Sequence, residues 1–402
     1  MKNVKDLKVE GKVVLVRCDF NVPFKNGVIS DDNRIVAALP TIKELISKGA
    51  KIVLMSHLGK IKHKEAPEVV EEQKKKNNLK PVSVRLQELL PETKVSFCEA
   101  TRGEELANAV KGLENGQILL VQNTRYEKGE EKCDPELSKE WASLCDAFVM
   151  DAFGSAHRAH ASTYGVPEIL KKEGKQVALG FLVEKEVVSL SKVVKCEERP
   201  YLAILGGFKV SDKIKVINSL LEKCDKIIIG GAMAYTFIKA LGGNIGTSPF
   251  EADQLEYAKK MYESGKILLP VDTKCANDFD NPTEVKIVES RNIPEGFEGL
   301  DIGPKTIELY TSEIAKAKTV FWNGPMGVFE KEAYQAGTIA VCKACADLKG
   351  KAFTVIGGGD SAAACKQFGF KDDFSHVSTG GGASLEMIEN NGHLPGIDVI
   401  GD

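Results

Sequence analysis

The chain has 402 residues, of which 28% are charged and 43% hydrophobic, and its formal net charge is -3. This length predicts about two domains, because single hydrophobic cores rarely grow beyond about 250–300 residues. The near-neutral charge excludes a general attraction to nucleic acid or anionic membranes. No apolar run is long enough to span a bilayer and no apolar signal segment opens the chain, so we expect a cytoplasmic protein.

Alternating strand and helix patterns fill the first half of the chain. Apolar runs typical of parallel strands buried on both faces occur at residues 12–17, 51–55, 95–98, 117–121 and 147–150. Helical patterns at about 32–47, 103–111 and 135–145 lie between several of these runs. This alternation predicts a doubly wound parallel sheet. Between Lys60 and Lys80 the chain is highly charged, which indicates a solvated surface excursion.

The second half repeats the pattern from Pro200 onward. Strand-like runs at residues 201–205, 226–229, 318–322 and 352–356 each end in a glycine-bearing turn before a helix. They predict a second α/β sheet. The helical segment from Val183 to Lys195 lies between the two series, so we interpret it as an interdomain helix with a hinge on either side. The expected boundaries are residues 1–182, 183–198 and 199–387.

The cysteines and arginines are distributed unevenly. Ten cysteines are scattered singly through apolar stretches, which predicts reduced thiols. Cys342 and Cys345 have the spacing of a metal or redox pair, but no second pair lies nearby and we expect neither role. Of the eight arginines, six lie in the first 160 residues, namely Arg17, Arg34, Arg85, Arg102, Arg125 and Arg158. Arginine binds carboxylates and phosphates bidentately, so the first half is predicted to bind a small anion.

Polar side chains gather where the strands of the first sheet end. Ligands of open parallel sheets bind at the carboxyl ends of the strands. The residues in such positions are Arg17, Asp19, Asn21, His57, Arg125, Asp151 and Arg158. His57 could act as a general base or as a hydrogen-bond donor to an anion. His157 and His160 lie in a loop without further ligands, so we do not expect a metal there.

A turn of three glycines, Gly357, Gly358 and Gly359, follows the last strand-like run. Asp360 and Ser361 come next, in a position to cap the following helix. Glycines and a helix N-terminus favour phosphate binding. Asp360 would repel a phosphate unless Mg²⁺ lay between them. The alternative is a simple strand-to-helix turn in which Asp360 is only a cap.

Two other turns carry candidate nucleotide ligands. After Gly206 and Gly207, Lys209 and Lys213 are four residues apart, which predicts one helical face directed at a polyphosphate. The passage from Asn323 to Glu330 offers an amide, glycines and a carboxylate. Glu330 could bind ribose hydroxyls or face solvent.

These motifs, taken in order, resemble the phosphoglycerate kinase family over essentially the whole chain. They are RCDFNVP at 17–23, DDNRI at 31–35, SHLG at 56–59, NTRY at 123–126, DAFGSAHRAH at 151–160, LGGFK at 205–209, WNGPMGVFE at 322–330, GGGDS at 357–361 and STGGGAS at 378–384.

The resemblance implies reversible phosphoryl transfer between 1,3-bisphosphoglycerate and Mg·ADP, in a monomer whose two domains close around the substrates. The implied triose ligands are Asp19, Phe20, Asn21, Arg34, His57, Leu58, Gly59, Lys60, Arg125 and Arg158. The implied nucleotide ligands are Lys209, Lys213, Gly230, Gly231, Gly299, Leu300, Asn323, Glu330, Gly357, Gly358, Gly359, Asp360 and Ser361. Arg34, Lys209 and Lys213 would be catalytic, and Asp360 would hold Mg²⁺. The tail at 388–402 would pack back on the first domain.

Two positions depart from the family pattern. Lys60 and Ile61 stand where the family usually has arginine and proline, so a bidentate contact becomes a point charge and triose binding should weaken. Phe208 stands where a small residue is usual. It would either narrow the adenine or ribose site or pack outward.

Two other functions would suit glycine-rich turns in α/β sheets. A nicotinamide dehydrogenase would need Gly-x-Gly-x-x-Gly in the first strand-to-helix turn and an acidic residue about 20 positions later, and the early turns show neither. A degenerate nucleotide-binding protein without turnover is the second alternative. The presence of Arg34, Lys213 and Asp360 argues against it.

Overall fold

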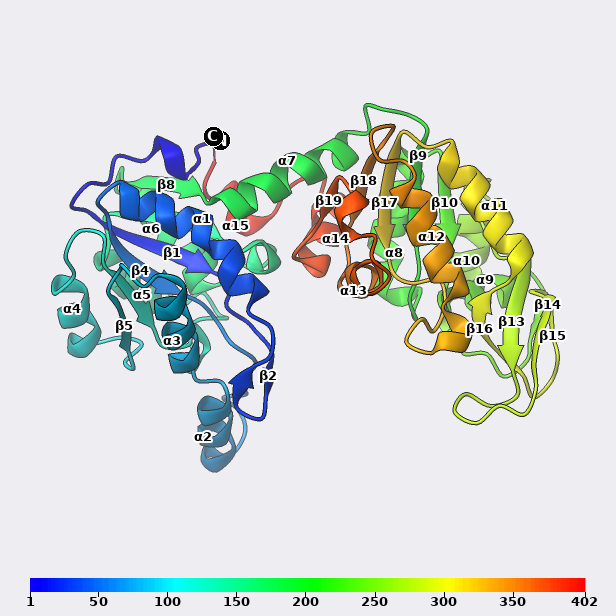
Figure 1. Cartoon of the computed structure of the whole chain (residues 1–402), viewed down its shortest axis with the longest axis horizontal. Coiled ribbons are helices and arrows are strands. Elements are labelled where there is room, and N and C mark those ends of the chain that lie inside the picture. Colours follow the sequence, from blue (N-terminus) through cyan, green and yellow to red (C-terminus); the bar gives the residue numbers. More distant parts are fainter. Residues whose placement is uncertain (402) are drawn as a thin grey trace. The chain divides into compact units, whose positions relative to one another are not determined.

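The computed structural model describes residues 1–401 and divides the chain into two compact units. The first contains Met1–Val187 and the C-terminal residues from His393, and the second is Val188–Gly392. The change from one unit to the other falls inside helix α7, which spans Phe181–Lys195 (Figure 1). Among the described residues, no helix is long and apolar enough to cross a membrane.

A six-stranded parallel sheet forms the centre of the first unit. Its order is β5-β6-β4-β1-β7-β8. The strands are β1 (Val13–Cys18), β4 (Lys51–Met55), β5 (Val95–Cys98), β6 (Ile118–Val121), β7 (Ala147–Asp151) and β8 (Gln176–Leu179). Strand β1 pairs with β4 from Val13 opposite Lys51 to Arg17 opposite Met55. Because every strand runs the same way, the loops that follow β1, β4, β6 and β7 share one edge of the sheet.

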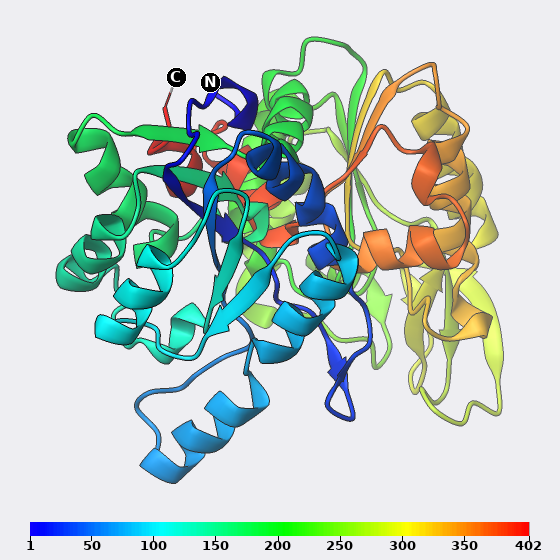
Figure 2. The same cartoon turned by 60° about the vertical axis from the view of Figure 1, so that its left-hand side comes forward.

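Helices cover the sheet of the first unit (Figure 2). The helices of this unit are α1 (Asn33–Ser47), α2 (Pro67–Lys76), α3 (Lys80–Leu89), α4 (Glu104–Lys111), α5 (Pro135–Ser143), α6 (Val166–Lys172) and α15 (Pro395–Asp398). Helix α1 buries Ile35, Ala38, Ile42 and Leu45, which share one face at a spacing of three to four residues. Helix α2, from the charged excursion, buries no residue and stands away from the sheet.

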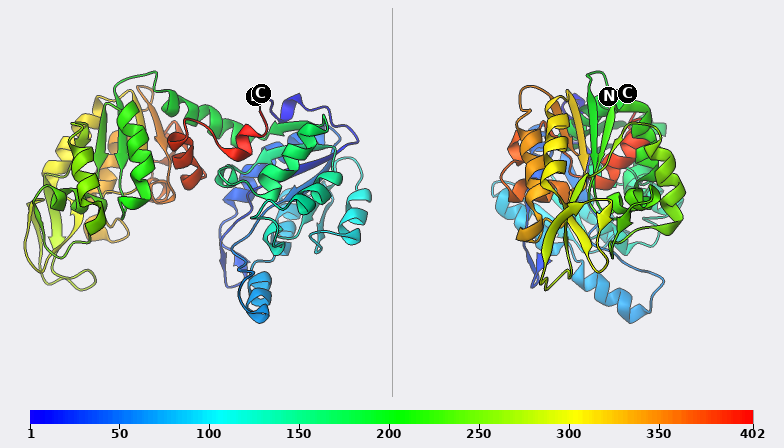
Figure 3. Two further views of the ribbon diagram at one scale, coloured as in Figure 1. Left: turned by 180° about the vertical axis from the view of Figure 1, so that it is seen from behind. Right: turned by 90° about the vertical axis from the view of Figure 1, so that its right-hand side faces the viewer.

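The C-terminal helix α15 packs within the first unit. The N–H of Gly396 donates to the carbonyl oxygen of Ala156 at 2.8 Å, and Lys171 Nζ donates to the carbonyl of Ile400 at 3.3 Å. Figure 3 shows this red segment lying against the first unit, close to the N-terminal segment.

The second unit contains another six-stranded parallel sheet, in the order β12-β10-β9-β17-β18-β19. The strands are β9 (Tyr201–Leu205), β10 (Lys226–Ile229), β12 (Ile267–Leu268), β17 (Thr319–Asn323), β18 (Phe353–Ile356) and β19 (His376–Val377). Its helices are α8 (Ile214–Lys223), α9 (Met233–Ala240), α10 (Leu255–Tyr262), α11 (Pro304–Ala315), α12 (Ala336–Ala346), α13 (Gly359–Gln367) and α14 (Gly381–Glu389). The prediction of two parallel α/β sheets is therefore confirmed.

Smaller sheets, which the sequence patterns did not predict, complete both units. Strands β13 (Asp272–Ala276), β14 (Val285–Glu289) and β16 (Glu298–Ile302) form an antiparallel sheet in the second unit, and β11 (Asn244–Ile245) pairs with β15 (Asn292–Ile293). In the first unit β2 (Phe24–Lys25) pairs with β3 (Val28–Ile29). Strand β14 exposes Val285 and Ile287, so its pattern lacks the buried apolar run of a central strand.

Candidate active site

Arg34 lies at the start of α1 and faces the loop that follows β1. Its Nη1 donates to both carboxylate oxygens of Asp19, at 3.0 and 3.2 Å, and to the carbonyl of Asn21 at 3.2 Å. The Arg34 side chain nevertheless remains 43% exposed. The acidic partner therefore orients the guanidinium without using all of its donors, and the remaining donors can bind an anion.

The loop after β4 carries His57, Leu58, Gly59 and Lys60. The N–H of Gly59 donates to Asn21 Oδ1 at 2.9 Å, which ties this loop to the one after β1. Gly59 has a φ of +59°, and a Cβ there would stand 2.2 Å from Asn77 Oδ1. Position 59 thus requires glycine both for its backbone conformation and for the close approach of Asn77.

Beside this loop lies a cavity of about 800 Å³. Its lining includes Lys60, Lys62, His63, Lys64, Arg125, Lys128, Lys132 and Arg158, with Glu65 and Glu131 as the acidic members. The volume suits a small ligand, and the excess of basic groups suits an anionic one. Lys60 was among the predicted triose ligands, whereas the other lysines and His63 were not predicted. The sequence feature that could have identified them is that the loops after two neighbouring strands are rich in lysine.

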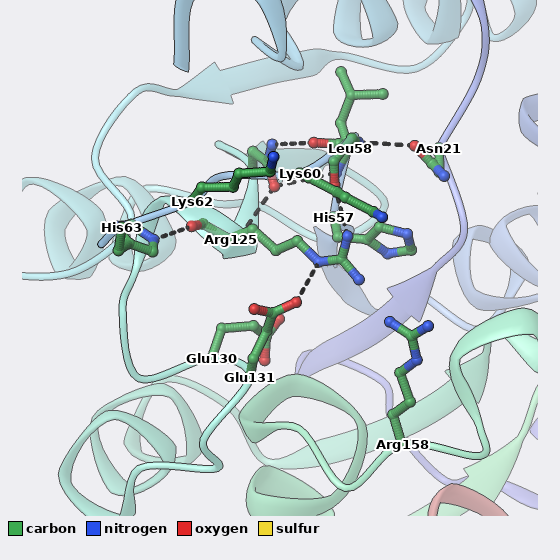
Figure 4. A network of polar contacts seen from close by, with 12 residues as sticks. Asn21, His57, Leu58, Lys60, Lys62, His63, Arg125, Glu130, Glu131 and Arg158 are labelled. Carbon is green, nitrogen blue, oxygen red and sulfur yellow. Dashed lines mark hydrogen bonds and ion pairs between the residues drawn. The ribbon is translucent and has the colours of Figure 1, made fainter. Parts of the chain in front are cut away.

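Arg125 and Arg158 reach this cavity from different loops. Arg125 Nη1 donates to the carbonyl of Gly59 at 2.6 Å, and its Nε lies 3.5 Å from Glu131 Oε1. In Figure 4 the ring of His57 and the guanidinium groups of Arg125 and Arg158 face the same space. The fold therefore brings together three cationic or N–H donor groups that are far apart in sequence.

Four strand-end residues of the first unit are internal. Arg17 and Asp151 are each 1% exposed, Phe20 is 0% and Leu58 is 2%. The interpretation of Arg17 and Asp151 as groups presented to a ligand was therefore wrong, because their side chains turn inward at the strand ends. For Phe20 and Leu58, only the backbone is available to a substrate.

His57 is buried and uncharged. Burial lowers its pKa well below the usual range, and the nearby Arg17, Arg125, Arg34 and His160 lower it further. A neutral imidazole has one donor and one acceptor nitrogen.

In the second unit, the turns after β9, β10 and β17 pack backbone against backbone. A Cβ at Gly206 would stand 2.0 Å from the carbonyl of Pro325, and one at Gly231 would stand 2.7 Å from the amide of Gly207. A Cβ at Gly230 would clash with Met326. These glycines let three strand ends come together at one edge of the sheet.

Lys213 is the basic group held at this edge. Its Nζ donates to the carbonyls of Gly206 and, at 3.2 Å, Asn323. Burial lowers the pKa of Lys213 to about 8, against the opposing effect of Asp360 and Asp212. The prediction that Lys209 and Lys213 share a helical face was wrong. Helix α8 begins at Ile214 and Lys209 lies in the preceding loop, exposed, because the glycine turn extends further than expected.

The glycine turn at 357–359 leads directly into α13. The helix begins at Gly359 and its N-cap is Gly358, so Asp360 and Ser361 lie in the first turn and neither caps the helix. Asn323 Nδ2 donates to the carbonyl of Gly357 at 2.8 Å, and the N–H of Gly324 donates to Ser361 Oγ at 2.7 Å. These bonds leave the first N–H groups of α13 free to meet a phosphate.

The donor set around Asp360 fits Mg²⁺ bound together with a nucleotide. The carboxylate is exposed and has no hydrogen bond or ion pair within residues 1–401. No group of three or more His, Cys, Asp or Glu side chains there could hold a metal ion by itself. Mg²⁺ is commonly held by one or two carboxylates while phosphates and water complete its coordination. Asp360 could supply that carboxylate.

The remaining predicted nucleotide ligands lie on other segments of the second unit. Gly299 in β16 donates its N–H to Ser248 Oγ at 2.9 Å, and a Cβ there would clash with Tyr235. The neighbouring Leu300 is 4% exposed. Glu330, in the turn after β17, is exposed. Phe208 is 64% exposed, so its ring faces solvent.

The fold and the site together define a two-unit α/β protein with a cavity rich in basic groups in one unit and glycine-rich turns at the strand ends of the other. A family model described as "Phosphoglycerate kinase" matches residues 4–391. Proteins named phosphoglycerate kinase from Macrococcus caseolyticus and Clostridium novyi are 54% and 53% identical, and the alignments cover 100% of this chain and 99% and 98% of theirs. The chain belongs to the phosphoglycerate kinase family.

Solved structures agree. The phosphoglycerate kinase of Coxiella burnetii matches with a TM-score of 0.86 and 37% identity over 99% of this chain and 98% of its own. That of Pyrococcus horikoshii matches with a TM-score of 0.82 and 32% identity over 100% of this chain and 98% of its own.

Proposed function

We propose that the protein catalyses reversible phosphoryl transfer from 1,3-bisphosphoglycerate to Mg·ADP, giving 3-phosphoglycerate and Mg·ATP. The observation that carries this proposal is the family match over residues 4–391, together with a relative that is 54% identical over the whole chain. The site chemistry supports it, since both candidate sites consist of cationic groups and N–H donors. Phosphoryl transfer depends on positioning and charge stabilisation, which such groups provide.

We infer that the two units divide the substrates. The first unit would hold the triose between Arg34, oriented by Asp19, and the cationic groups of Lys60, Arg125 and Arg158. A hydrogen bond from His57 would add orientation without adding charge. Asp19 would orient Arg34 through its hydrogen bonds and would not act as a base.

The second unit would hold the nucleotide. The N–H groups at the start of α13 and the side chains of Lys209 and Lys213 would bind its phosphates. Asp360 would hold Mg²⁺, which supplies neutralisation of phosphate charge when bound. Gly230, Gly231, Gly299 and Leu300 would line the adenine site, and Glu330 would bind the ribose. These assignments rest on the family motifs.

Arg34 and Lys213 are the proposed stabilisers of the transferred phosphoryl group. Lys213 is suited to this role because its ammonium is held by the carbonyls of Gly206 and Asn323, so little reorganisation is needed when charge develops nearby. Closure of the units during turnover would bring the substrates together and exclude water, which would otherwise hydrolyse the acyl phosphate. We propose that the enzyme acts as a monomer in the cytoplasm, on small molecules alone.

A coupled assay of ATP-dependent phosphorylation of 3-phosphoglycerate, with purified protein and Mg²⁺, tests the proposal. We expect turnover at roughly 1–1,000 s⁻¹, the usual range of enzymes. Nucleotide binding without turnover would instead identify a degenerate member of the family and overturn the proposed activity.

A further inference from the structure

Arg17 is an arginine of the first unit that the substrate cannot reach. It lies near the end of β1 and is 1% exposed. Its Nε donates to Ser162 Oγ at 2.9 Å, and its Nη1 donates to the carbonyl of Cys18 at 2.6 Å. A guanidinium enclosed in this way is not available to an anionic ligand, so its role differs from that of Arg125.

The third contact of Arg17 is with the ring of His57. Arg17 Nη2 lies 3.1 Å from His57 Nδ1. Arginine has donors and no acceptor, so Nδ1 must accept this hydrogen bond and carry no proton. In a neutral imidazole the proton then lies on Nε2, which makes no hydrogen bond with any other residue from 1 to 401.

Arg17 is held in place by a buried carboxylate that acts through a hydroxyl. The Ser162 hydroxyl donates to Glu130 Oε2 at 2.7 Å, and the Ser162 N–H donates to Glu130 Oε1 at 2.8 Å. Glu130 is 0% exposed, and its charge raises the pKa of Arg17 against the effect of burial. The hydrogen bonds run in one direction, from Arg17 through Ser162 to Glu130, so the guanidinium cannot turn away without leaving buried groups unpaired.

The neighbouring groups that lower the pKa of His57 are all cationic or can become so. Arg17 comes from β1, Arg34 from α1, Arg125 from the loop after β6, and His160 from the loop after β7. Together with burial they hold the pKa of His57 well below its usual range. His57 is therefore neutral near pH 7, and the position of its single proton is what remains to be decided.

We propose that Arg17 is a positioning residue, which fixes His57 in the tautomer that carries its proton on Nε2 and so aims one N–H donor at an oxygen of the three-carbon substrate. This inference rests on the proposed function and deepens it. In the other tautomer a lone pair of Nε2 would face the anionic substrate, and the contact would become repulsive. Glu130 and Ser162 are positioning residues one step further from the ligand, because they hold Arg17 in place.

The tautomer is tested first, without any ligand. Full-length protein labelled with ¹⁵N-histidine is examined near pH 7 by long-range ¹H–¹⁵N correlation, and the signals of His57 are assigned by their loss in His57→Gln. We expect Nε2 to carry the proton and Nδ1 to be unprotonated. A proton on Nδ1 would overturn the proposal, and this measurement needs no Arg17 variant to fold.

The role in binding is tested by a double-mutant cycle with Arg17→Met and His57→Ala. Arg17→Met should weaken the Kd for 3-phosphoglycerate about tenfold, the usual effect of losing one hydrogen bond to a charged group. In the His57→Ala background it should have no further effect. Arg102→Met is the matched control, since Arg102 is a surface arginine paired with Glu140 and should leave binding unchanged.

An equal loss with and without His57 would mean that Arg17 acts on the anion directly, and the proposal would be wrong. If the wild-type protein had no affinity for 3-phosphoglycerate, the proposed function would fail together with the ligand part of this inference. The spectrum would still decide whether His57 carries its proton on Nε2, as the contact with Arg17 requires.

Discussion

Asn123 holds the backbone of Leu58 through both of its polar groups. The N–H of Leu58 donates to Asn123 Oδ1 at 3.1 Å, and Asn123 Nδ2 donates to the Leu58 carbonyl at 2.7 Å. The same buried amide donates to the Asn77 carbonyl and accepts from the Arg125 N–H, each at 3.0 Å. One side chain therefore fixes the loops that carry His57 and Arg125 relative to each other.

Asn123→Ala should consequently damage both stability and triose binding. The change removes four hydrogen bonds and leaves buried backbone groups unpaired, so we expect the free energy of unfolding to fall by about 3 kcal/mol. The KM for 3-phosphoglycerate should rise, because the loops lose their common support. Denaturant unfolding and steady-state kinetics measure the two effects. Asn108→Ala, at an exposed position of α4, is the control, and equal stability of the two variants would contradict the assigned role.

Lys60→Arg should strengthen triose binding. Lys60 is exposed and lines the cavity with Arg125 and Arg158, where a guanidinium could form two hydrogen bonds to a phosphate. We expect the KM for 3-phosphoglycerate to fall about threefold to tenfold. Lys111→Arg, at the end of α4, should change nothing. An unchanged KM in Lys60→Arg would contradict this prediction, because the second hydrogen bond of an arginine would then add nothing to triose binding.

Asp360→Ala should weaken the binding of Mg·ADP and lower kcat by about tenfold to a hundredfold, while the Kd for 3-phosphoglycerate stays within about twofold. The reason is that Asp360 belongs to the second unit, which we propose to hold the nucleotide. Calorimetry with and without Mg²⁺ separates the effects, since ADP alone should bind the variant at least as well as the wild type. The exposed Asp372 provides the control substitution. Equal loss of affinity for both substrates would refute the division.

Deprotonation of Lys213 should make the rate of turnover decline at alkaline pH. Burial lowers the pKa of Lys213 to about 8, so the free enzyme loses this positive charge above that pH. We expect kcat/KM for the nucleotide to decline with an apparent pKa near 8, because this parameter reports the free enzyme. The Lys213→Arg variant stays charged, so its kcat/KM should not decline over this pH range even if its rate is lower. If kcat/KM of Lys213→Arg still declined near pH 8, the group that titrates would be another residue.

Asp151 should make stability fall as pH rises. Burial raises its pKa from 3.8 to about 7, against the lowering effect of the Thr41 hydroxyl and the backbone N–H groups of Val183 and Leu182. Between these two pH values the folded protein keeps a proton that the unfolded chain has lost, so this contribution to stability is complete below about pH 4 and is lost by about pH 7.

Asp151→Asn tests this directly. At pH 8 the variant should exceed the wild type in free energy of unfolding by up to about 4 kcal/mol, because no charge is then buried. The difference should shrink as pH falls towards 4. Asp253→Asn, at an exposed site, should show neither effect. If the difference in free energy of unfolding between Asp151→Asn and the wild type did not change with pH, Asp151 would not be the group that titrates.

The central strands and the strand-end motifs were predictable for physical reasons. Strands such as β1 and β9 are buried on both faces, so their apolar runs are unmistakable, and glycine turns mark where they end. Of the edge strands of the two large sheets, β5 was predicted. The others and the antiparallel sheet were missed because strands such as β12 are very short, and because β14 alternates exposed with half-buried residues. Such segments form strands mainly through their neighbours.

The roles of individual site residues were harder to predict. Lys209 lies outside the helix, and Asp360 is not a cap, because boundaries depend on turn geometry that one sequence does not reveal. Arg17 and Asp151 have the same strand-end positions as the groups that we propose to bind ligands. Whether such a side chain turns towards the ligand or into the core depends on partners more than a hundred residues away, Ser162 for Arg17 and Thr41 for Asp151.

By itself, then, the sequence determined two parallel α/β sheets, the positions of the strand ends that carry the candidate ligand groups, and the ordered motifs of the phosphoglycerate kinase family. These depend on local apolar patterns and on residue types that are visible along the chain. Only the tertiary structure decided that Asn123 supports the triose loops, that Arg17 faces His57, and that Lys213 is held by the carbonyls of two other turns. Contacts between distant segments set hydrogen-bond direction, burial and charge state. These properties distinguish a residue that could bind a substrate from a residue that only holds another in place.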